Sequence, residues 1–246
     1  PFRFTFRNIH CENTGLYGLY PVECVGVLVE DCRVTGISDA GIYIGQSKDI
    51  IVRRNVTYGN VTGIEIENSV NALVENNEVY NNAGGILVFL LPNNPSKVSL
   101  NCKIINNYVY NNNHVNFAEP GSIVSNVPQG TGLMIMAGDS VEVTGNRFHN
   151  NQSFGVSVIG LDLFFGKDFV YDVDPIPDAC WLYNNDYRNN GYNPAKIVKD
   201  SGLDGADLLW DVTGYNNNWD EENVTSIPPI LPNKDWSWLI RKTNYR

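Results

Sequence analysis

The sequence predicts an all-β fold, and three observations support this class. The 246 residues include 34 asparagines, 22 glycines and 12 prolines, which favour turns and weaken helices. Val, Ile and Tyr, which favour strands, recur in short runs between those turns. The same arrangement then returns along the chain at a nearly constant interval. These features exclude an all-helical protein.

A repeat of about 22 residues organises the first three quarters of the chain. The first strand of the repeat falls at 4–6, 27–29, 50–52, 72–74, 102–104, 141–143 and 180–182. The second is centred on Cys11, Val34, Thr57, Val79, Val109, Phe148 and Tyr187. The third begins at Gly18, Gly41, Gly63, Gly85, Gly132 and Gly155, which lie 23, 22, 22, 47 and 23 residues apart.

Three short strands per coil, with Asn and Gly at fixed turn positions, predict a right-handed parallel β-helix. Inward side chains of successive coils then stack in columns, so no coil buries its core alone. A buried asparagine ladder is expected at the corner after the first strand, at Asn55, Asn77, Asn107, Asn146 and Asn185.

The repeat defines the domain organisation. Residues 1–190 are expected to form the β-helix, interrupted by insertions near 90–101, 114–130 and 160–178. Residues 191–246 contain four tryptophans and many of the prolines, and are predicted to form an irregular cap that covers the edge of the last coil.

Charge limits the partners. A formal net charge of −10 with only 17 Lys and Arg argues against nucleic acid and anionic membranes, which need clustered cations. No apolar run is long enough for a membrane span. The sequence opens inside a repeat without Met, so we expect a mature or truncated chain whose true N-terminus lies upstream, with the signal peptide outside this sequence.

Four segments of the repeat carry a family resemblance: 38–47 (SDAGIYIGQS), 51–55 (IVRRN), 63–69 (GIEIENS) and 84–89 (GGILVF). They resemble the right-handed parallel β-helix superfamily, which includes polysaccharide lyases, uronan C5-epimerases and polygalacturonases. They are most similar to bacterial parallel β-helix repeat-containing proteins without an assigned activity. The resemblance implies a secreted, periplasmic or cell-surface protein.

The catalytic motifs of those enzyme families are absent. The Asp-Pro-His-Asp tetrad of the epimerases does not occur, nor do the paired aspartates and the Arg-Ile-Lys triplet of polygalacturonases. Whether the protein is an enzyme therefore stays open, and a lyase-like or epimerase-like activity is one reading.

The outward positions of the third strand form the first candidate site. Aromatic rings contact the apolar faces of sugars and carboxylates accept hydrogen bonds from sugar hydroxyls. This reasoning assigns a polysaccharide-binding role to Tyr20, Asp39, Tyr43, Gln46, Glu65 and Glu67. For catalysis, Glu65 and Glu67 are weak candidates. The same oxygens suit a cation, and an aromatic column with exposed glutamates is also a common structural feature of such faces.

Two loop pairs are weaker candidates. His114 and Glu119, in the second insertion, have the residue types for acid–base catalysis. Asp172 and Asp174, in the third, place two carboxylates on one side of an extended segment, which leaves Ca²⁺ open as a ligand. No other cofactor is indicated.

Two functions follow. The first is a protein outside the cytoplasm that binds, and in one variant modifies, an acidic or neutral polysaccharide. The alternative is a non-catalytic scaffold or subunit of a larger assembly, which contacts another protein subunit through the apolar outward residues Leu87, Phe89, Met134 and Met136. A homo-oligomer is also left open.

Overall fold

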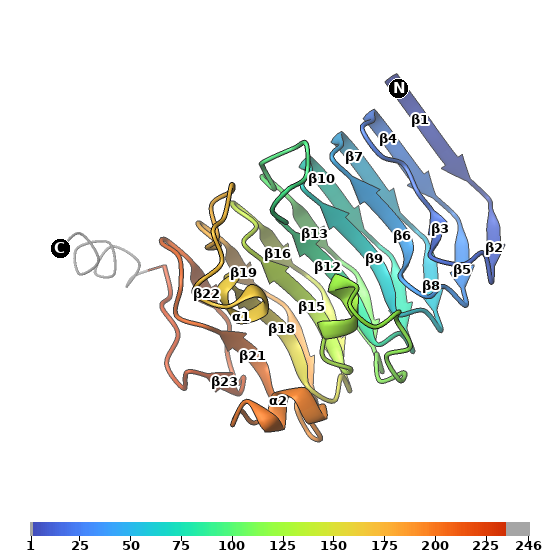
Figure 1. Cartoon of the computed structure of the whole chain (residues 1–246). Helices are drawn as coiled ribbons and strands as arrows, with labels where there is room; N and C mark the ends of the chain where they lie inside the picture. The colour runs from blue at the N-terminus through green and yellow to red at the C-terminus, as the bar shows by residue number, and fades with distance from the viewer. Residues whose placement is uncertain (1, 235–246) are drawn as a thin grey trace.

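Three parallel sheets run along the molecule (Figure 1). The structure is a computed structural model and describes residues 2–234. Each complete coil gives one strand to each sheet, and equivalent strands of successive coils pair in parallel. The chain is therefore the parallel β-helix that the repeat predicts.

The first sheet contains β1 (Phe2–Arg7), β4 (Val25–Glu30), β7 (Lys48–Arg53), β10 (Val70–Glu75), β13 (Lys103–Ile105), β16 (Glu142–Thr144), β19 (Trp181–Tyr183) and β22 (Asn218–Asp220). The second contains β2 (His10–Glu12), β5 (Arg33–Thr35), β8 (Val56–Tyr58), β11 (Glu78–Tyr80), β14 (Tyr108–Tyr110), β17 (Arg147–His149) and β20 (Asp186–Arg188). The third contains β3 (Tyr17–Leu19), β6 (Ala40–Gly45), β9 (Thr62–Glu67), β12 (Gly84–Phe89), β15 (Thr131–Met136), β18 (Phe154–Ile159), β21 (Ala206–Trp210) and β23 (Ser226–Ile227).

The predicted register is confirmed in all three sheets. In the third sheet, for example, Ile42 pairs with Ile64 and Ile64 with Ile86. A slip of one residue would turn every inward side chain outward, so the apolar columns fix the register.

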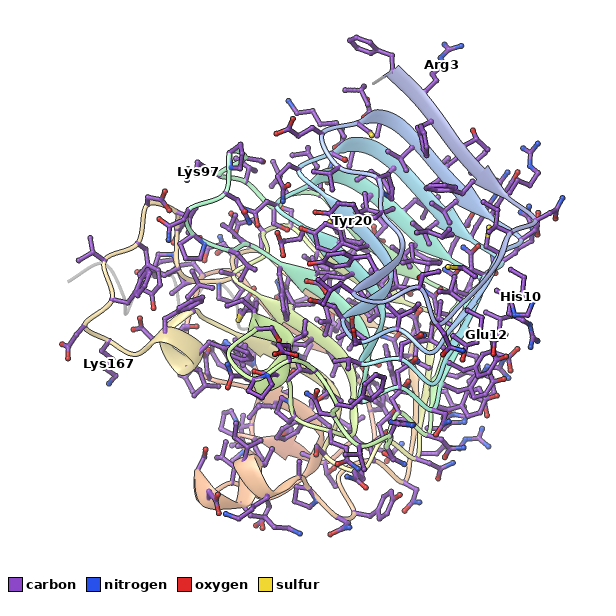
Figure 2. All side chains as sticks on the ribbon, turned by 45° about the vertical axis from the view of Figure 1, so that its right-hand side comes forward. Arg3, His10, Glu12, Tyr20, Lys97 and Lys167 are labelled. Carbon is purple, nitrogen blue, oxygen red and sulfur yellow. The ribbon has the colours of Figure 1, made fainter. Side chains whose placement is uncertain are left out.

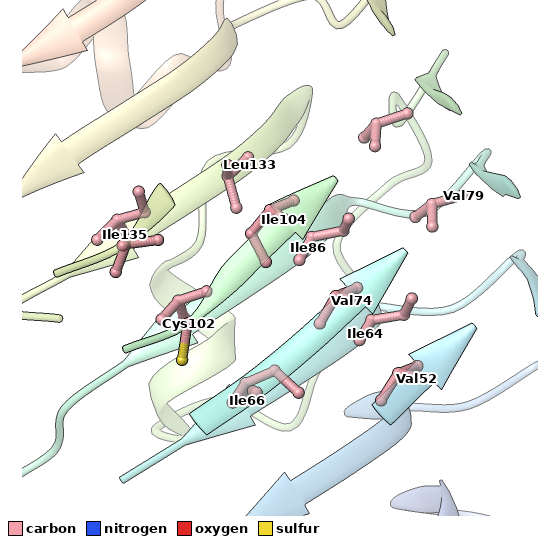
Figure 3. Packing of buried hydrophobic residues seen from close by; sticks show 14 of the residues in the cluster. Val52, Ile64, Ile66, Val74, Val79, Ile86, Cys102, Ile104, Leu133 and Ile135 are labelled. Atoms are coloured by element: carbon pink, nitrogen blue, oxygen red, sulfur yellow. The ribbon is translucent and has the colours of Figure 1, made fainter. Parts of the chain in front are cut away.

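Inward-facing aliphatic side chains fill the interior of the coil (Figure 3). Val52 and Val74 of the first sheet meet Ile64 and Ile86 of the third, and all four are fully buried. Burying each side chain of this size contributes about 1.5–3 kcal/mol relative to exposure. The stack of coils is therefore the source of the core.

Asparagine side chains stack at the corner between the first and second sheets. The Asn77 amide donates hydrogen bonds to the Val52 carbonyl and the Asn107 side-chain carbonyl, both at 2.9 Å. Asn107 repeats this pattern with Val74 and Asn146. A second buried column at the next corner contains Asn60, Asn82, Asn112, Asn151 and Asn190.

Serines occupy the corner between the third and first sheets. The Ser69 hydroxyl accepts a hydrogen bond from the Ser47 backbone N–H, and the Ser47 hydroxyl accepts one from Cys24. This column uses a smaller side chain than the other two, and the repeat pattern in asparagine did not reveal it.

The insertions fold back over the outer face of the third sheet. They carry the 3₁₀ helix η1 (Ile123–Asn126) and the short helix α1 (Asp162–Phe165), and α2 (Lys196–Asp200) joins them from the segment after residue 190. Phe164 of α1 and Val198 of α2 belong to a second apolar cluster on that face.

The predicted partner-contact patch is wrong because this second cluster covers it. The cluster contains Leu87, Phe89, Met134 and Met136, all 0–2% exposed. The chain's own loops bury these apolar side chains, which are therefore not available to contact another subunit.

Strand pairing continues past residue 190, where the sequence suggested a cap. β21 pairs with β18, β22 with β19, and β23 with β21. The Trp210 and Trp219 rings pack against each other at this end of the core, with centroids 5.0 Å apart. Two further tryptophans of the predicted cap, Trp236 and Trp238, lie outside the described residues.

Candidate functional site

The candidate site lies on the outer face of the third sheet, over β3, β6 and β9. Tyr43 of β6 is the direct neighbour of Glu65 in β9, and Gly45 is the neighbour of Glu67. Because side chains alternate along a strand, all four positions face away from the core. The repeat therefore places the predicted residues Tyr43, Glu65 and Glu67 side by side.

Three tyrosines stack at one end of this face. The three rings form one compact cluster, with centroids 4.3 Å apart for Tyr17 and Tyr20 and 4.9 Å apart from each of these to Tyr43. Tyr20 is 49% exposed and Tyr43 only 6%. Tyr20 is therefore the accessible surface of the stack, and Figure 2 shows it over the strands of this face.

Glu67 is held by three hydrogen-bond donors. The Tyr43 hydroxyl donates to Glu67 Oε1 at 2.7 Å, Asn94 Nδ2 at 2.9 Å and Gln46 Nε2 at 3.1 Å. Asn94 comes from the first insertion, which thus completes the site. Its contribution and that of Tyr17 were not predicted, although Tyr17 could have been found because it precedes Tyr20 by three residues.

Glu65 and Glu67 form a buried carboxyl pair. Glu65 is 2% exposed and Glu67 7%. Burial is the largest cause that raises both pKa values, and the neighbouring Glu67 charge raises the pKa of Glu65 further. Glu65 is the group that keeps a proton, since its hydrogen bond with Glu67 raises its own pKa and lowers that of its partner.

Asp39 is the more accessible carboxyl of the site. Burial raises its pKa to about 6, and the Glu67 charge adds to this, whereas a hydrogen bond with Tyr17 acts in the opposite direction. A carboxyl that changes its charge near pH 6 can take up or release a proton close to neutral pH.

The site is acidic without a neutralising side chain. Within residues 2–234, no ion pair joins Asp39, Glu65 or Glu67 to a lysine, arginine or histidine. Burial, and after it the mutual repulsion of the carboxyl groups, favour protonation. This arrangement suits hydroxyl groups or cations better than anions.

The other predicted catalytic pair is not brought together. The His114 ring lies 2.8 Å from the Val115 carbonyl and packs edge-on to Phe117. No hydrogen bond or ion pair between His114 and Glu119 occurs in the described part of the chain.

The carboxylates of the third insertion are used in loop contacts. Asp172 pairs with Lys97 and accepts a hydrogen bond from the Asn93 backbone at 3.0 Å, so its pKa is lowered, chiefly by Lys97. Asp174 accepts a weaker one from the Ile176 backbone at 3.3 Å. Across residues 2–234, no three His, Cys, Asp or Glu side chains gather as metal ligands.

Solved structures with this architecture include two epimerases. The periplasmic alginate epimerase AlgG is 18% identical, with a TM-score of 0.56, over 89% of this chain and 45% of AlgG. The A-module of Azotobacter vinelandii mannuronan C-5 epimerase AlgE4 is 12% identical, with a TM-score of 0.50, over 89% of this chain and 58% of that one.

At these identities the likeness concerns the fold. The chain spans under half the length of AlgG. No curated protein matches the chain significantly. Helices of the described residues are all too short or too polar to cross a membrane.

The family comparison agrees with the strand topology. A model described as "right handed beta helix region" matches residues 2–163, which is well over half of the sequence. The chain therefore belongs to the right-handed β-helix family.

Proposed function

We propose that this protein binds a polysaccharide on the outer face of the third sheet. The tyrosine–carboxylate site consists of Tyr17, Tyr20, Asp39, Tyr43, Gln46, Glu65, Glu67 and Asn94. One observation carries the proposal: the half-exposed Tyr20 ring packs on Tyr43, and the Tyr43 hydroxyl donates a hydrogen bond to Glu67 of the buried Glu65–Glu67 pair. An exposed ring beside convergent polar groups is the usual composition of a sugar site.

The site contains the two kinds of contact that a sugar ring needs. The exposed part of Tyr20 offers an apolar surface for the C–H groups of a pyranose. Asp39 and Gln46, both partly accessible, offer an acceptor and an amide to its hydroxyls. Tyr43 and Asn94 hold Glu67 in place, which limits the ordering required on binding.

Charge favours an uncharged glycan at this site. The site offers no cation to pair with a uronate, and those of its carboxyl groups that are ionised repel one, which leaves hydroxyl groups as the better ligands. The acidic polysaccharides that the sequence left open are therefore disfavoured at the tyrosine–carboxylate site.

Sugar modification is the second candidate, and Asp39 favours it. Its pKa of about 6 lets it accept or donate a proton near neutral pH, while the neighbouring Glu65 stays protonated. Asp39 would act as the general acid or base on a bound sugar, with burial and the Glu67 charge raising its pKa. A location outside the cytoplasm belongs to the same proposal, supported by the periplasmic location named for AlgG.

Binding to an uncharged glycan panel tests the proposal. Isothermal titration calorimetry with β-glucan, xylan and chitin oligosaccharides should find a ligand whose affinity falls roughly tenfold in Tyr20→Ala, because ring contacts contribute about 0.5–1.5 kcal/mol. Tyr192→Ala is the matched control, since Tyr192 is 54% exposed and lies outside the site. Equal losses in both variants, or no binding by any glycan, would refute it.

Product analysis separates binding from modification. Mass spectrometry and an assay of newly formed reducing ends should detect turnover of any bound glycan, and Asp39→Asn should abolish it without abolishing binding. Binding without any product would leave the protein a polysaccharide-binding module and remove the catalytic candidate.

A further inference from the structure

The outer face of the second sheet carries a separate row of tyrosines. Tyr58, Tyr80 and Tyr110 stack rung upon rung, with ring centroids 5.3 and 5.1 Å apart and planes within 15° of parallel. Tyr108 stacks on Tyr110 at 4.1 Å. In Figure 2, His10 and Glu12 of β2 mark this face at the right-hand edge. It lies on a different side of the coil from the tyrosine–carboxylate site.

An arginine lies over a tyrosine near each end of the row. The Arg147 guanidinium lies 4.0 Å from the centre of the Tyr108 ring, and Arg33 lies 5.3 Å from that of Tyr58. Both arginines are exposed. Neither forms an ion pair with any carboxylate of residues 2–234.

Arg147 is unpaired because its neighbouring carboxylate is already engaged. Asp186 is its partner in the strand register. The Asp186 carboxylate instead bonds Arg188 at 2.9 Å and His149 at 3.0 Å.

A shallow pocket of about 390 Å³ opens beside Arg147. Its lining also includes Tyr108 and the side chains of Asn76 and Asn106, whose amides form no hydrogen bond within the described residues. The acidic residue in the lining is Glu78, and its carboxylate already accepts a 2.8 Å hydrogen bond from Tyr110. The pocket therefore combines the donors of Arg147, Asn76 and Asn106 with one carboxylate, and Arg147 supplies its positive charge.

Stacking prepares Arg147 for an anion. A guanidinium held against a ring still presents its planar N–H groups, which match the two oxygens of a carboxylate or sulfate. The rotamer entropy that a free arginine loses on binding is partly removed beforehand.

We propose that the Arg147 pocket binds a carboxylate or sulfate group of an acidic glycan. Arg147 would hold the two anionic oxygens, with Asn76 and Asn106 donating to the same group or to neighbouring hydroxyls. The proposal is independent of the tyrosine–carboxylate site.

Calorimetry with matched ligands tests this pocket on the whole chain. The ligands are an oligogalacturonate and its methyl ester, and a dextran sulfate oligosaccharide and plain dextran. We expect binding of one or both acidic ligands only, weakened by salt because the contact is ionic. Arg147→Gln should reduce the affinity roughly tenfold, since hydrogen bonds to charged groups are among the stronger ones. The affinity of the Arg147→Lys variant should lie between those of the native chain and Arg147→Gln, because lysine keeps the charge but loses the planar set of donors.

Arg33→Gln is the control, because Arg33 also lies over a tyrosine ring, 5.3 Å from its centre, but does not line the pocket. Preference for galacturonate or for dextran sulfate identifies the anionic group, and either supports the proposal. Equal affinity for the neutral ligands, an equal effect of the Arg33 and Arg147 variants, or no binding by either acidic ligand would overturn it. So would equal binding of poly-glutamate, which would identify an acidic peptide instead. Tyr20→Ala should leave this binding unchanged.

Discussion

The Tyr43 ring lies directly over Gly45, two residues further along the same strand. A methyl group built on Gly45 would lie 2.6 Å from a Tyr43 ring carbon and 2.7 Å from its hydroxyl oxygen. This close approach lets the hydroxyl reach Glu67, the neighbour of Gly45 in the next coil. The glycine is thus required by the tyrosine and not by backbone conformation.

Gly45→Ala should therefore disorganise the site. The added methyl group overlaps the Tyr43 ring, and overpacking of this kind costs about 1–3 kcal/mol. Urea unfolding should show this loss, and glycan affinity should fall with it. In the Tyr43→Ala background the same glycine substitution should cost much less, because the overlapping ring is gone. An equal cost in both backgrounds would mean that Tyr43 does not determine the need for glycine.

Tyr43→Phe should raise the pKa of Glu67 with little change to the stack. The Tyr43 hydroxyl makes the largest contribution that lowers the pKa of this carboxyl, against the still larger opposite effect of burial. Removing the donor leaves the charged form less well solvated. NMR of ¹³C-labelled glutamate carboxyls measures the shift, and Gln46→Ala, which also removes a donor to Glu67, should act in the same direction. A lowered or unchanged pKa would contradict this account.

Glu65→Gln should flatten the dependence of stability on pH. The pKa of Glu65 is raised above the ordinary value of 4.5, so the folded chain keeps a proton that the unfolded chain releases. Between pH 4.5 and the raised value, the free energy of unfolding therefore falls as pH increases. Glutamine keeps a donor toward Glu67 and has no proton to lose.

Urea titrations of both proteins from pH 4 to pH 8 check this prediction. The Glu65→Gln variant should gain stability relative to the native chain as pH rises. Burial also raises the pKa of Asp139 to about 6, so the pH dependence of stability that Asp139 causes remains in both proteins. Parallel curves for the variant and the native chain would show that Glu65 does not hold the proton.

Asn107→Ala should be strongly destabilising. Its side chain donates to Val74 and Asn146, and its oxygen accepts from both nitrogens of Asn77. Each buried group left unpaired costs about 1–3 kcal/mol, so the total loss should exceed about 3 kcal/mol. Asn106→Gly is the control, since Asn106 is exposed, has a positive φ that glycine accepts, and should change the unfolding free energy by about 0.5 kcal/mol or less. Similar losses for both would refute the importance of the column.

The repeat made the fold predictable, because each inward column is visible in the sequence. The spacing of Gly41, Gly63 and Gly85 gave the register that the structure confirms. It also placed Tyr43 beside Glu65, since register alone decides which residues are neighbours across strands. Prediction was therefore good wherever contacts follow from the period of the coil.

Contacts made by residues outside the repeat were not predictable. Asn94 reaches Glu67 from an insertion whose path no repeat defines. The same is true of the loops that bury Leu87 and Met134, which a pattern of outward positions places in solvent. Arg147 has no ion pair because Asp186 pairs with His149 and Arg188 instead, and sequence spacing does not show which of these partners Asp186 binds.

The three corners of the coil differ in how much change they tolerate. Each insertion lies directly before or directly after a third-sheet strand, following β12, β14 or β18. The turn from the first sheet to the second, in contrast, keeps the same length in every coil from β4 to β20. An added residue at that turn would separate Asn77 from Asn107 and break the column on both sides. New loops can therefore be grafted at the other two corners, so this scaffold can diversify the third-sheet face while the opposite corner stays constant.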